Sequence, residues 1–279
     1  MRRIEQSGPR ALHLGIGAAL LAVLGVVAPA QAQQMIIGGE AKIDRVRLSG
    51  LLWRGDLNGT IAVPVVDPVA NVLGDGIDVQ ETLGLDGGAS GWVVNADFGL
   101  SKRHRFLFSF SGLQHSGINE LTIPLGDGVP PFDVVTDSRV SIRAIHGAYN
   151  FLYASTSWIE AGAIGGVGYF SNTVAVMSNI VEVSEDFKSP YPVLGGNVLF
   201  KSEDIISIYA EFTGFPDVHV GDFSGSQSQA TIRFFVYPTP DIGFSAGYQR
   251  YQLSLDDAGT GVSIDFVWDG FIVGGQYRF

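Results

Sequence analysis

The chain has 279 residues, a net charge of −11 and no cysteine; 46% of its residues are hydrophobic and only 16% are charged. The acidic balance excludes a basic nucleic-acid footprint, and the lack of cysteine excludes disulfides, thiolate metal sites and thiol nucleophiles. Soluble domains carry about 25% charged residues, so the low charged fraction favours a chain whose surface does not lie entirely in water.

The first 32 residues have the pattern of a secretory signal peptide. Arg2, Arg3 and Arg10 form a basic leader, residues 12–27 are mostly apolar, and Ala30 and Ala32 supply the small residues of a cleavage site. A membrane-anchoring helix is the alternative, but the apolar stretch is shorter than the ~20 residues that a spanning helix needs. We expect residues 1–32 to be cleaved after export and residues 33–279 to form one domain.

Ten strand-like segments follow, in which apolar residues tend to recur at every second position. They cover residues 46–65, 91–101, 103–115, 138–153, 158–170, 191–201, 205–215, 229–237, 242–255 and 262–279. Phe106, Phe108 and Phe110 show the alternation most plainly, with Leu107 and Ser109 between them. Beyond the signal, no apolar run reaches the length of a spanning helix. Apolarity divided into short alternating pieces predicts a β-barrel.

The joints between these segments alternate in length. Residues 101–104, 154–157, 201–204 and 238–241 are tight joints, whereas residues 66–90, 116–137, 171–190 and 216–228 are long ones. Membrane barrels have short periplasmic turns and longer outer loops. A soluble barrel of the lipocalin type would direct its large apolar residues inward, but here the positions between the aromatic residues are polar or small. We expect an all-β fold, a transmembrane antiparallel up-and-down β-barrel of ten strands, with eight or twelve as alternatives.

The first long joint contains the sequence IDVQETLGLD, from Ile77 to Asp86, which has the pattern of a short amphipathic turn. Such a segment caps a barrel, folds into it or lies at its surface. We expect an ordinary surface loop.

The last segment alternates up to a C-terminal aromatic residue, with Tyr277 and Phe279 on one face and Gly274 before them. This spacing resembles the closing strand that Gram-negative outer-membrane proteins present to their assembly machinery, although Ile272 stands where a polar residue is usual. The whole chain resembles, as architecture, the small outer-membrane barrels that include OmpA- and OmpW-type proteins. That resemblance implies a bacterial outer-membrane location and a monomer. It also implies contact with lipid and lipopolysaccharide, and with periplasmic chaperones and the assembly machinery.

Several charged residues fall on the faces opposite the apolar stripes. They are Asp97, Arg143, Glu160, Lys201, Glu211 and Arg233. A charge in a confined interior is unfavourable unless it is paired and hydrogen-bonded. We therefore predict a network of lumen charges that holds the barrel shut, with a narrow polar channel as the alternative. The interior of a barrel of eight to ten strands is mostly filled by side chains, which favours the network.

Candidate catalytic residues are few. His115 and Ser116 are adjacent on a strand and point to opposite faces, so the histidine cannot readily activate the serine; deacylase barrels place such a pair two residues apart. His219 and Asp217 lie in a long joint and invite comparison with the ten-stranded omptin proteases, but no motif matches residue by residue. We expect no enzymatic activity, no cofactor and no metal site.

The long joints are rich in Asp and Glu. Solvation explains such a composition, and bridging of lipopolysaccharide phosphates by divalent cations is the alternative. The leading expectation is therefore a non-enzymatic barrel, structural or allowing limited passive transport of small solutes. The alternatives are a surface binding or adhesion module acting through the acidic outer loops, and a lipid- or peptide-acting hydrolase.

Overall fold

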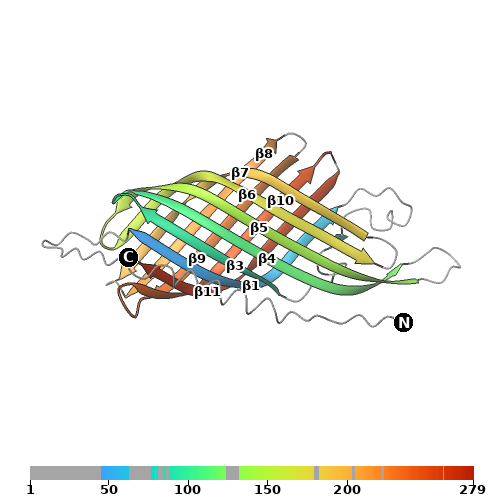
Figure 1. The fold of residues 1–279 in the computed structure, drawn as a ribbon, viewed down its shortest axis with the longest axis horizontal. Coiled ribbons are helices and arrows are strands. Elements are labelled where there is room, and N and C mark those ends of the chain that lie inside the picture. The colour runs from blue at the N-terminus through green and yellow to red at the C-terminus, as the bar shows by residue number, and fades with distance from the viewer. Residues whose placement is uncertain are drawn as a thin grey trace. The chain divides into compact units, whose positions relative to one another are not determined.

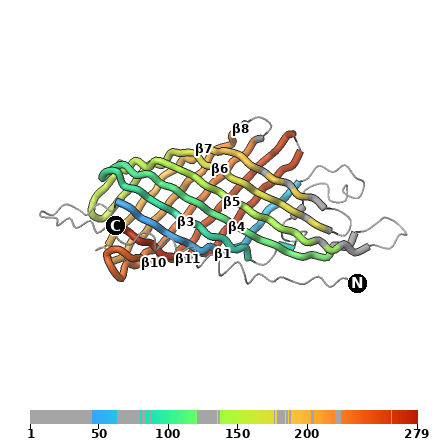
Figure 2. Tube along the Cα trace, viewed as in Figure 1, coloured from blue at the N-terminus to red at the C-terminus, as the bar shows by residue number. Residues whose placement is uncertain are grey.

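A computed structural model describes residues 45–62, 77–78, 80, 84–85, 88–123, 132–178, 182–202, 205–220, 223–259 and 261–279. The predicted signal peptide lies outside these residues. In the described part, ten long antiparallel strands form one up-and-down sheet, and pairing of the last strand with the first closes it into a barrel (Figures 1 and 2). The predicted all-β class and the strand number are confirmed. None of the described residues form a helix that is long and apolar enough to cross a membrane.

The barrel strands follow one another in chain order around the wall. They are β1 (Val46–Ala62), β3 (Ala89–Gly99), β4 (His104–Ile123), β5 (Phe132–Ser155), β6 (Ile159–Ser178), β7 (Glu182–Ser202), β8 (Ile206–Val220), β9 (Phe223–Val236), β10 (Ile242–Asp257) and β11 (Val262–Arg278). The two-residue strand β2 (Ile77–Asp78) adds to the edge of β1 at Thr60 and Ile61. We call the end with the short turns the inner end and the other the outer end.

The outside of the barrel carries an apolar belt that starts at the inner end. On β4, Phe106, Phe108 and Phe110 point outward and are 41–51% exposed. On β5 the belt runs over alternate residues from Ile145 to Tyr153, a stretch of nine residues. That length agrees with the ~9–11 residues of a tilted strand that crosses a bilayer. So many exposed rings and aliphatic side chains are unfavourable in water, and the belt has the composition of a lipid-facing surface.

Above the belt, the two faces of the wall exchange character: the outer face becomes mostly polar and the inner face apolar. The outward positions of β9 become Ser228, Ser226 and Ser224. Those of β10 become Arg250 and Gln252, followed by further polar residues. These strands therefore extend beyond the belt into a zone whose outer face is mostly polar. Strands of 14 to 24 residues on β4 to β11 are longer than a bilayer requires.

The interior of this outer zone is an apolar core. Trp53 and Trp268 stack with ring centroids 3.3 Å apart, and Leu253 and Phe266 have no exposed surface. We call these and the following buried side chains the outer core: Leu57, Ile61, Leu85, Leu113, Val140, Ile142, Val174, Phe215, Tyr251, Leu255, Val262 and Ile264. Burial there raises the pKa of the Tyr251 phenol. At about 1.5–3 kcal/mol for each fully buried large apolar side chain, this packing makes a major contribution to folding.

Part of the first outer loop completes this core. The β1–β3 ladder stops at Gly55 and Ala89, and beyond it the two-residue strand β2 is the only described strand that pairs with β1 on that side. Leu85 fills the space and is 1% exposed, and His115 Nε2 donates to its carbonyl oxygen at 2.8 Å. Gln80 Nε2 donates to the Leu57 carbonyl at 3.1 Å. The expected surface loop at Ile77–Asp86 is thus wrong for the residues described: they fold inward because the wall is incomplete there.

The wall has a second gap, between β7 and β8. Their ladder ends at Leu194 and Gly214, although β7 continues on β6 and β8 continues on β9. Proline residues stand on both edges beyond this point: Pro190 and Pro192 on β7, and Pro216 on β8. Proline has no N–H for a ladder, so these residues account for the end of the pairing. Behind the gap, the rings of Tyr191 and Phe215 pack at 5.4 Å.

Replacing His115 with alanine is expected to loosen the first outer loop. The substitution leaves the buried Leu85 carbonyl without its donor, which weakens the docking by about 1–2 kcal/mol. Hydrogen–deuterium exchange of peptides covering residues 77–88 measures the effect, and faster exchange is expected. Ser116→Ala is the matched control, because Ser116 lies next in sequence but points outward. Equal exchange in both variants would contradict the docking role of His115.

Candidate functional site

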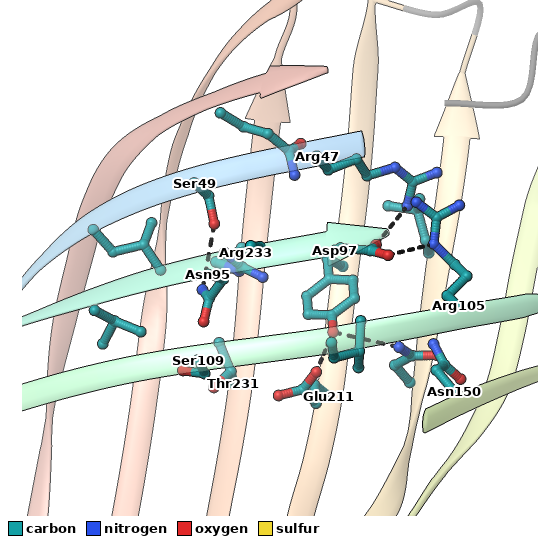
Figure 3. A pocket seen from close by; sticks show the side chains of 18 of the residues that line it. Arg47, Ser49, Asn95, Asp97, Arg105, Ser109, Asn150, Glu211, Thr231 and Arg233 are labelled. Carbon is teal, nitrogen blue, oxygen red and sulfur yellow. Dashed lines mark hydrogen bonds and ion pairs between the residues drawn. The ribbon is translucent and has the colours of Figure 1, made fainter. Parts of the chain in front are cut away.

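The interior of the inner half holds a cluster of charged side chains from five strands. Arg47 Nη2 lies 3.1 Å from Glu160 Oε2, and Lys201 Nζ lies 2.5 Å from Glu160 Oε1. Asp97 joins the cluster through Arg105 Nε at 2.6 Å and Arg47 Nη1 at 3.8 Å (Figure 3). Three cations thus share two carboxylates across the barrel. The exposed fractions of these side chains are 4–19%, so solvent screens the pairs little.

A second group lies on β8 and β9, the strands that follow β7 along the wall. The Tyr209 hydroxyl donates to the Glu211 carboxylate. Arg233 is 9% exposed, and its guanidinium lies 4.7 Å from the centre of the Tyr209 ring and 5.1 Å from that of Phe235. Its Nε and Nη1 donate to no atom of the described residues. Contact with two aromatic faces therefore stabilises this cation in place of hydrogen bonds to those two nitrogens.

Residues of both groups line a cavity of about 110 Å³, which we call the inner chamber. A buried water needs at least ~10–15 Å³ of such space, so the chamber has room for several waters among its polar groups. Asn95 and Ser49 add a 3.3 Å hydrogen bond to its wall (Figure 3). Further out, a cavity of about 40 Å³ borders the Trp53–Trp268 stack. Beyond this cavity, the side chains of the outer core fill the cross-section of the barrel.

Of the six charged residues expected inside the barrel, Asp97, Glu160, Glu211 and Arg233 line the inner chamber. Arg143 does not. It lies above the belt on the outer face of β5 and is exposed, while Ile142 and Ala144 beside it point inward. This corrects the expectation for Arg143, which rested on a segment whose sequence alternates poorly.

Sequence reasoning missed two members of the cluster. Arg105 follows the tight joint at residues 101–104 and was not among the expected lumen charges, but it is 3% exposed inside the barrel. The alternation of the sequence could have placed it there, because Arg105 shares the face of Leu107 and Ser109, opposite the aromatic stripe of β4. Arg47 shares a face with Ser49 in the same way. Lys201, named with the lumen charges from its strand face, is in the cluster.

The proposed assembly signal lies at the closing seam of the barrel. Phe279 is 43% exposed, and its backbone N–H and carbonyl both bond to Val46. The rings of Tyr277 and Phe279 are 5.5 Å apart on the outer face. Gly274 faces inward and packs tightly against Gly50 of β1. The arrangement places both rings on the outside of the barrel at the inner end; the role in assembly stays a prediction.

The candidate catalytic residues are not brought together. His115 points inward and Ser116 outward, as their adjacency on β4 predicts. His219 and Asp217 are both exposed at the outer end of β8, next to an irregularity between Phe215 and Val218, with no hydrogen bond between them. The described part of the chain holds no group of three or more His, Cys, Asp or Glu side chains placed to bind a metal ion.

No protein-family model and no curated protein matches the sequence. Structural comparison aligns the chain with outer-membrane β-barrels. The alignment with the outer-membrane protease OmpT from Escherichia coli has a TM-score of 0.50 and 9% sequence identity. It covers 86% of this chain and 99% of the OmpT chain. The alignment with Ail, the attachment invasion locus protein of Yersinia pestis, has a TM-score of 0.35 and 11% sequence identity. It covers 84% of this chain and 99% of the Ail chain. At such identities the likeness shows the fold alone: this chain has the fold of a small outer-membrane β-barrel.

Proposed function

We propose that this chain is a non-enzymatic β-barrel of the bacterial outer membrane whose lumen is closed and which acts at the cell surface. The outer-membrane location is supported by the barrel fold and by the apolar belt of bilayer height. The proposal includes export through the N-terminal signal and insertion by the assembly machinery, with Gly274, Tyr277 and Phe279 as its signal. Periplasmic chaperones would hold the unfolded chain before insertion. We propose that it works as a monomer, because the belt surrounds a complete barrel.

The observation that carries the closed lumen is the outer core. Water and ions cross a barrel along a continuous polar path, but here large side chains with no exposed surface, Leu253 and Phe266 among them, fill the section above the inner chamber. The stacked rings of Trp53 and Trp268 lie directly beneath. Of the structural and transport alternatives, this packing favours the structural one.

Single-channel recording of the refolded protein in a planar bilayer tests the closed lumen. The altered gel mobility of unheated barrels shows beforehand that the sample is folded. We expect no steady conductance above the bare bilayer. Uniform conductance steps that scale with protein concentration would contradict the proposal and make passive transport the function.

The surface binding alternative has support of its own. The wall extends beyond the belt with a polar outer face, which holds a rigid surface above the bilayer, and the outer loops are acidic. Deleting an outer loop and measuring adhesion to host extracellular matrix would test it. If the loops bind a partner, we expect adhesion to be lost on deletion. Equal adhesion of the deletion variant and the intact protein would leave only the structural role.

The hydrolase alternative rests on His219 and Asp217, which are exposed and not hydrogen-bonded to each other. We therefore do not favour it. Cleavage of a basic peptide or of lipid A by the wild-type barrel, lost in His219→Ala, would overturn this judgement.

A further inference from the structure

A row of three polar side chains crosses the outer face of β5, β6 and β7 just above the belt. The strand register places Arg143 opposite Ser171, and Ser171 opposite Lys188. Neighbouring strands lie about 4.8 Å apart, so the backbones of Arg143 and Lys188 are about 10 Å apart with the serine between them. We call Arg143, Ser171 and Lys188 the headgroup row.

The row directly beneath is apolar and belongs to the belt. Its members are paired in the same way, with Phe110 opposite Ile145 and Ile145 opposite Tyr169. These three side chains are 46%, 53% and 44% exposed. Acyl chains lying on this row would bring their headgroup to the level of Arg143, Ser171 and Lys188. On β5 the wall thus changes from an apolar to a basic residue within two positions, from Ile145 to Arg143.

Arg143 supplies the charge that needs a partner. It is exposed and makes no hydrogen bond or ion pair with any described residue. Its cross-strand neighbours, Gly112 and Ser171, are neutral. Lys188 is less available, because its Nζ lies 3.5 Å from the Asp186 carboxylate, which also accepts from the Thr173 hydroxyl at 2.6 Å. Both members of that pair are more than half exposed, so it is a weak one.

We propose that the headgroup row binds the phosphate group of an acylated, phosphorylated lipid of the outer leaflet. Arg143 would hold the phosphate through its forked N–H donors, the Ser171 hydroxyl would donate to it, and Lys188 would add charge. The acyl chains would cover Phe110, Ile145 and Tyr169. The inference rests on the proposed outer-membrane location, and it assigns the lipid contact to one face of the barrel.

Another basic residue just above the belt lacks these conditions and serves as a control. Arg250 on β10 is exposed like Arg143, but it stands opposite Asp269 on β11. Asp56 and Asp269 also face each other on β1 and β11. The charge of that face is therefore balanced by carboxylates, which would repel a lipid phosphate.

The test measures binding of lipid A to the folded barrel in zwitterionic detergent by native mass spectrometry. Diphosphorylated lipid A is compared with its dephosphorylated form. We expect one tightly bound diphosphorylated molecule and weakening of its affinity by about tenfold in Arg143→Gln, as for loss of a charge-assisted contact. Lys188→Gln is expected to weaken binding less, about threefold, and Asp186→Asn to tighten it. Arg250→Gln should leave the affinity within about twofold, and all variants should keep the gel mobility of the folded barrel.

Three results would overturn the inference: equal loss in Arg143→Gln and Arg250→Gln, equal binding of the dephosphorylated lipid, or displacement by millimolar inorganic phosphate. The last would mean a site for free anions rather than for lipid. A barrel that is folded and non-conducting but does not discriminate between these lipids would refute the headgroup row and leave the proposed function intact. A conducting barrel would refute the proposed function whatever its lipid binding.

Discussion

Replacing Trp268 with alanine is expected to lower the free energy of unfolding by about 3–5 kcal/mol, the range for removing a large aromatic side chain from a core. The indole is 4% exposed and stacks on Trp53. Gly91 beside it leaves room for the ring, since a Cβ at that position would lie 2.3 Å from a ring atom. The backbone of the rigid wall cannot collapse into the space, and the nearby cavity of about 40 Å³ would enlarge.

Urea unfolding in detergent, followed by the gel mobility of the folded form, measures this loss without relying on tryptophan fluorescence. Trp158→Ala provides the matched control, because Trp158 is 59% exposed at the inner end. It is expected to change stability by less than about 1 kcal/mol. Equal effects of the two substitutions would show that the outer core does not stabilise the barrel.

Replacing Glu160 with glutamine is expected to destabilise the barrel by about 2–4 kcal/mol at neutral pH, slightly below the range for a fully buried ion pair. The substitution keeps the volume of the side chain but leaves Arg47 and Lys201 without their shared carboxylate. Two neighbouring cations would then remain in a confined interior. Because the cluster is nearly buried, the loss should depend little on salt.

Glu120→Gln is the control for this experiment, since the same change occurs at an exposed position of β4. It should alter the unfolding free energy by less than about 0.5 kcal/mol. The double variant Glu160→Met and Lys201→Met should recover part of the loss, because it removes Lys201, whose ion pair is with Glu160, together with the carboxylate. If the loss of unfolding free energy in Glu160→Gln vanished in high salt, this would contradict the buried character of the cluster.

Sequence reasoning located the inner ends of the strands well and the outer ends poorly. The expected segment 103–115 became β4 (His104–Ile123), and residues expected in the long joint 171–190 belong to β6 and β7. The reason is that the polar and apolar faces of the strands exchange places above the belt. Inside the belt, apolar residues point outward, so the alternation indicates a membrane strand. Above the belt most outward residues are polar, and with the prolines of β7 they have the composition of a surface loop.

The same reversal explains the site residues. The faces of Asp97, Glu160 and Glu211 could be predicted because each lies opposite a clear apolar stripe. Arg143 was assigned to the wrong face because β5 has apolar residues on both faces around it, Ile142 inside and Ile145 outside. The docking of Leu85 could not be predicted, since it depends on a gap between β1 and β4 that only the assembled wall creates.

The position of the belt along the barrel is the central claim, and single-cysteine spin labelling of β5 tests it most directly. The chain has no native cysteine, so labels report only the chosen position. Collision rates with oxygen, which dissolves in lipid, and with a nickel chelate, which stays in water, are measured in liposomes. The labelled positions are 135, 137, 139, 141, 143, 145, 147, 149, 151 and 153. We predict contact with lipid from 145 to 153 and with water from 135 to 143; labels that contact lipid along the whole strand, or water along all of it, would contradict the account.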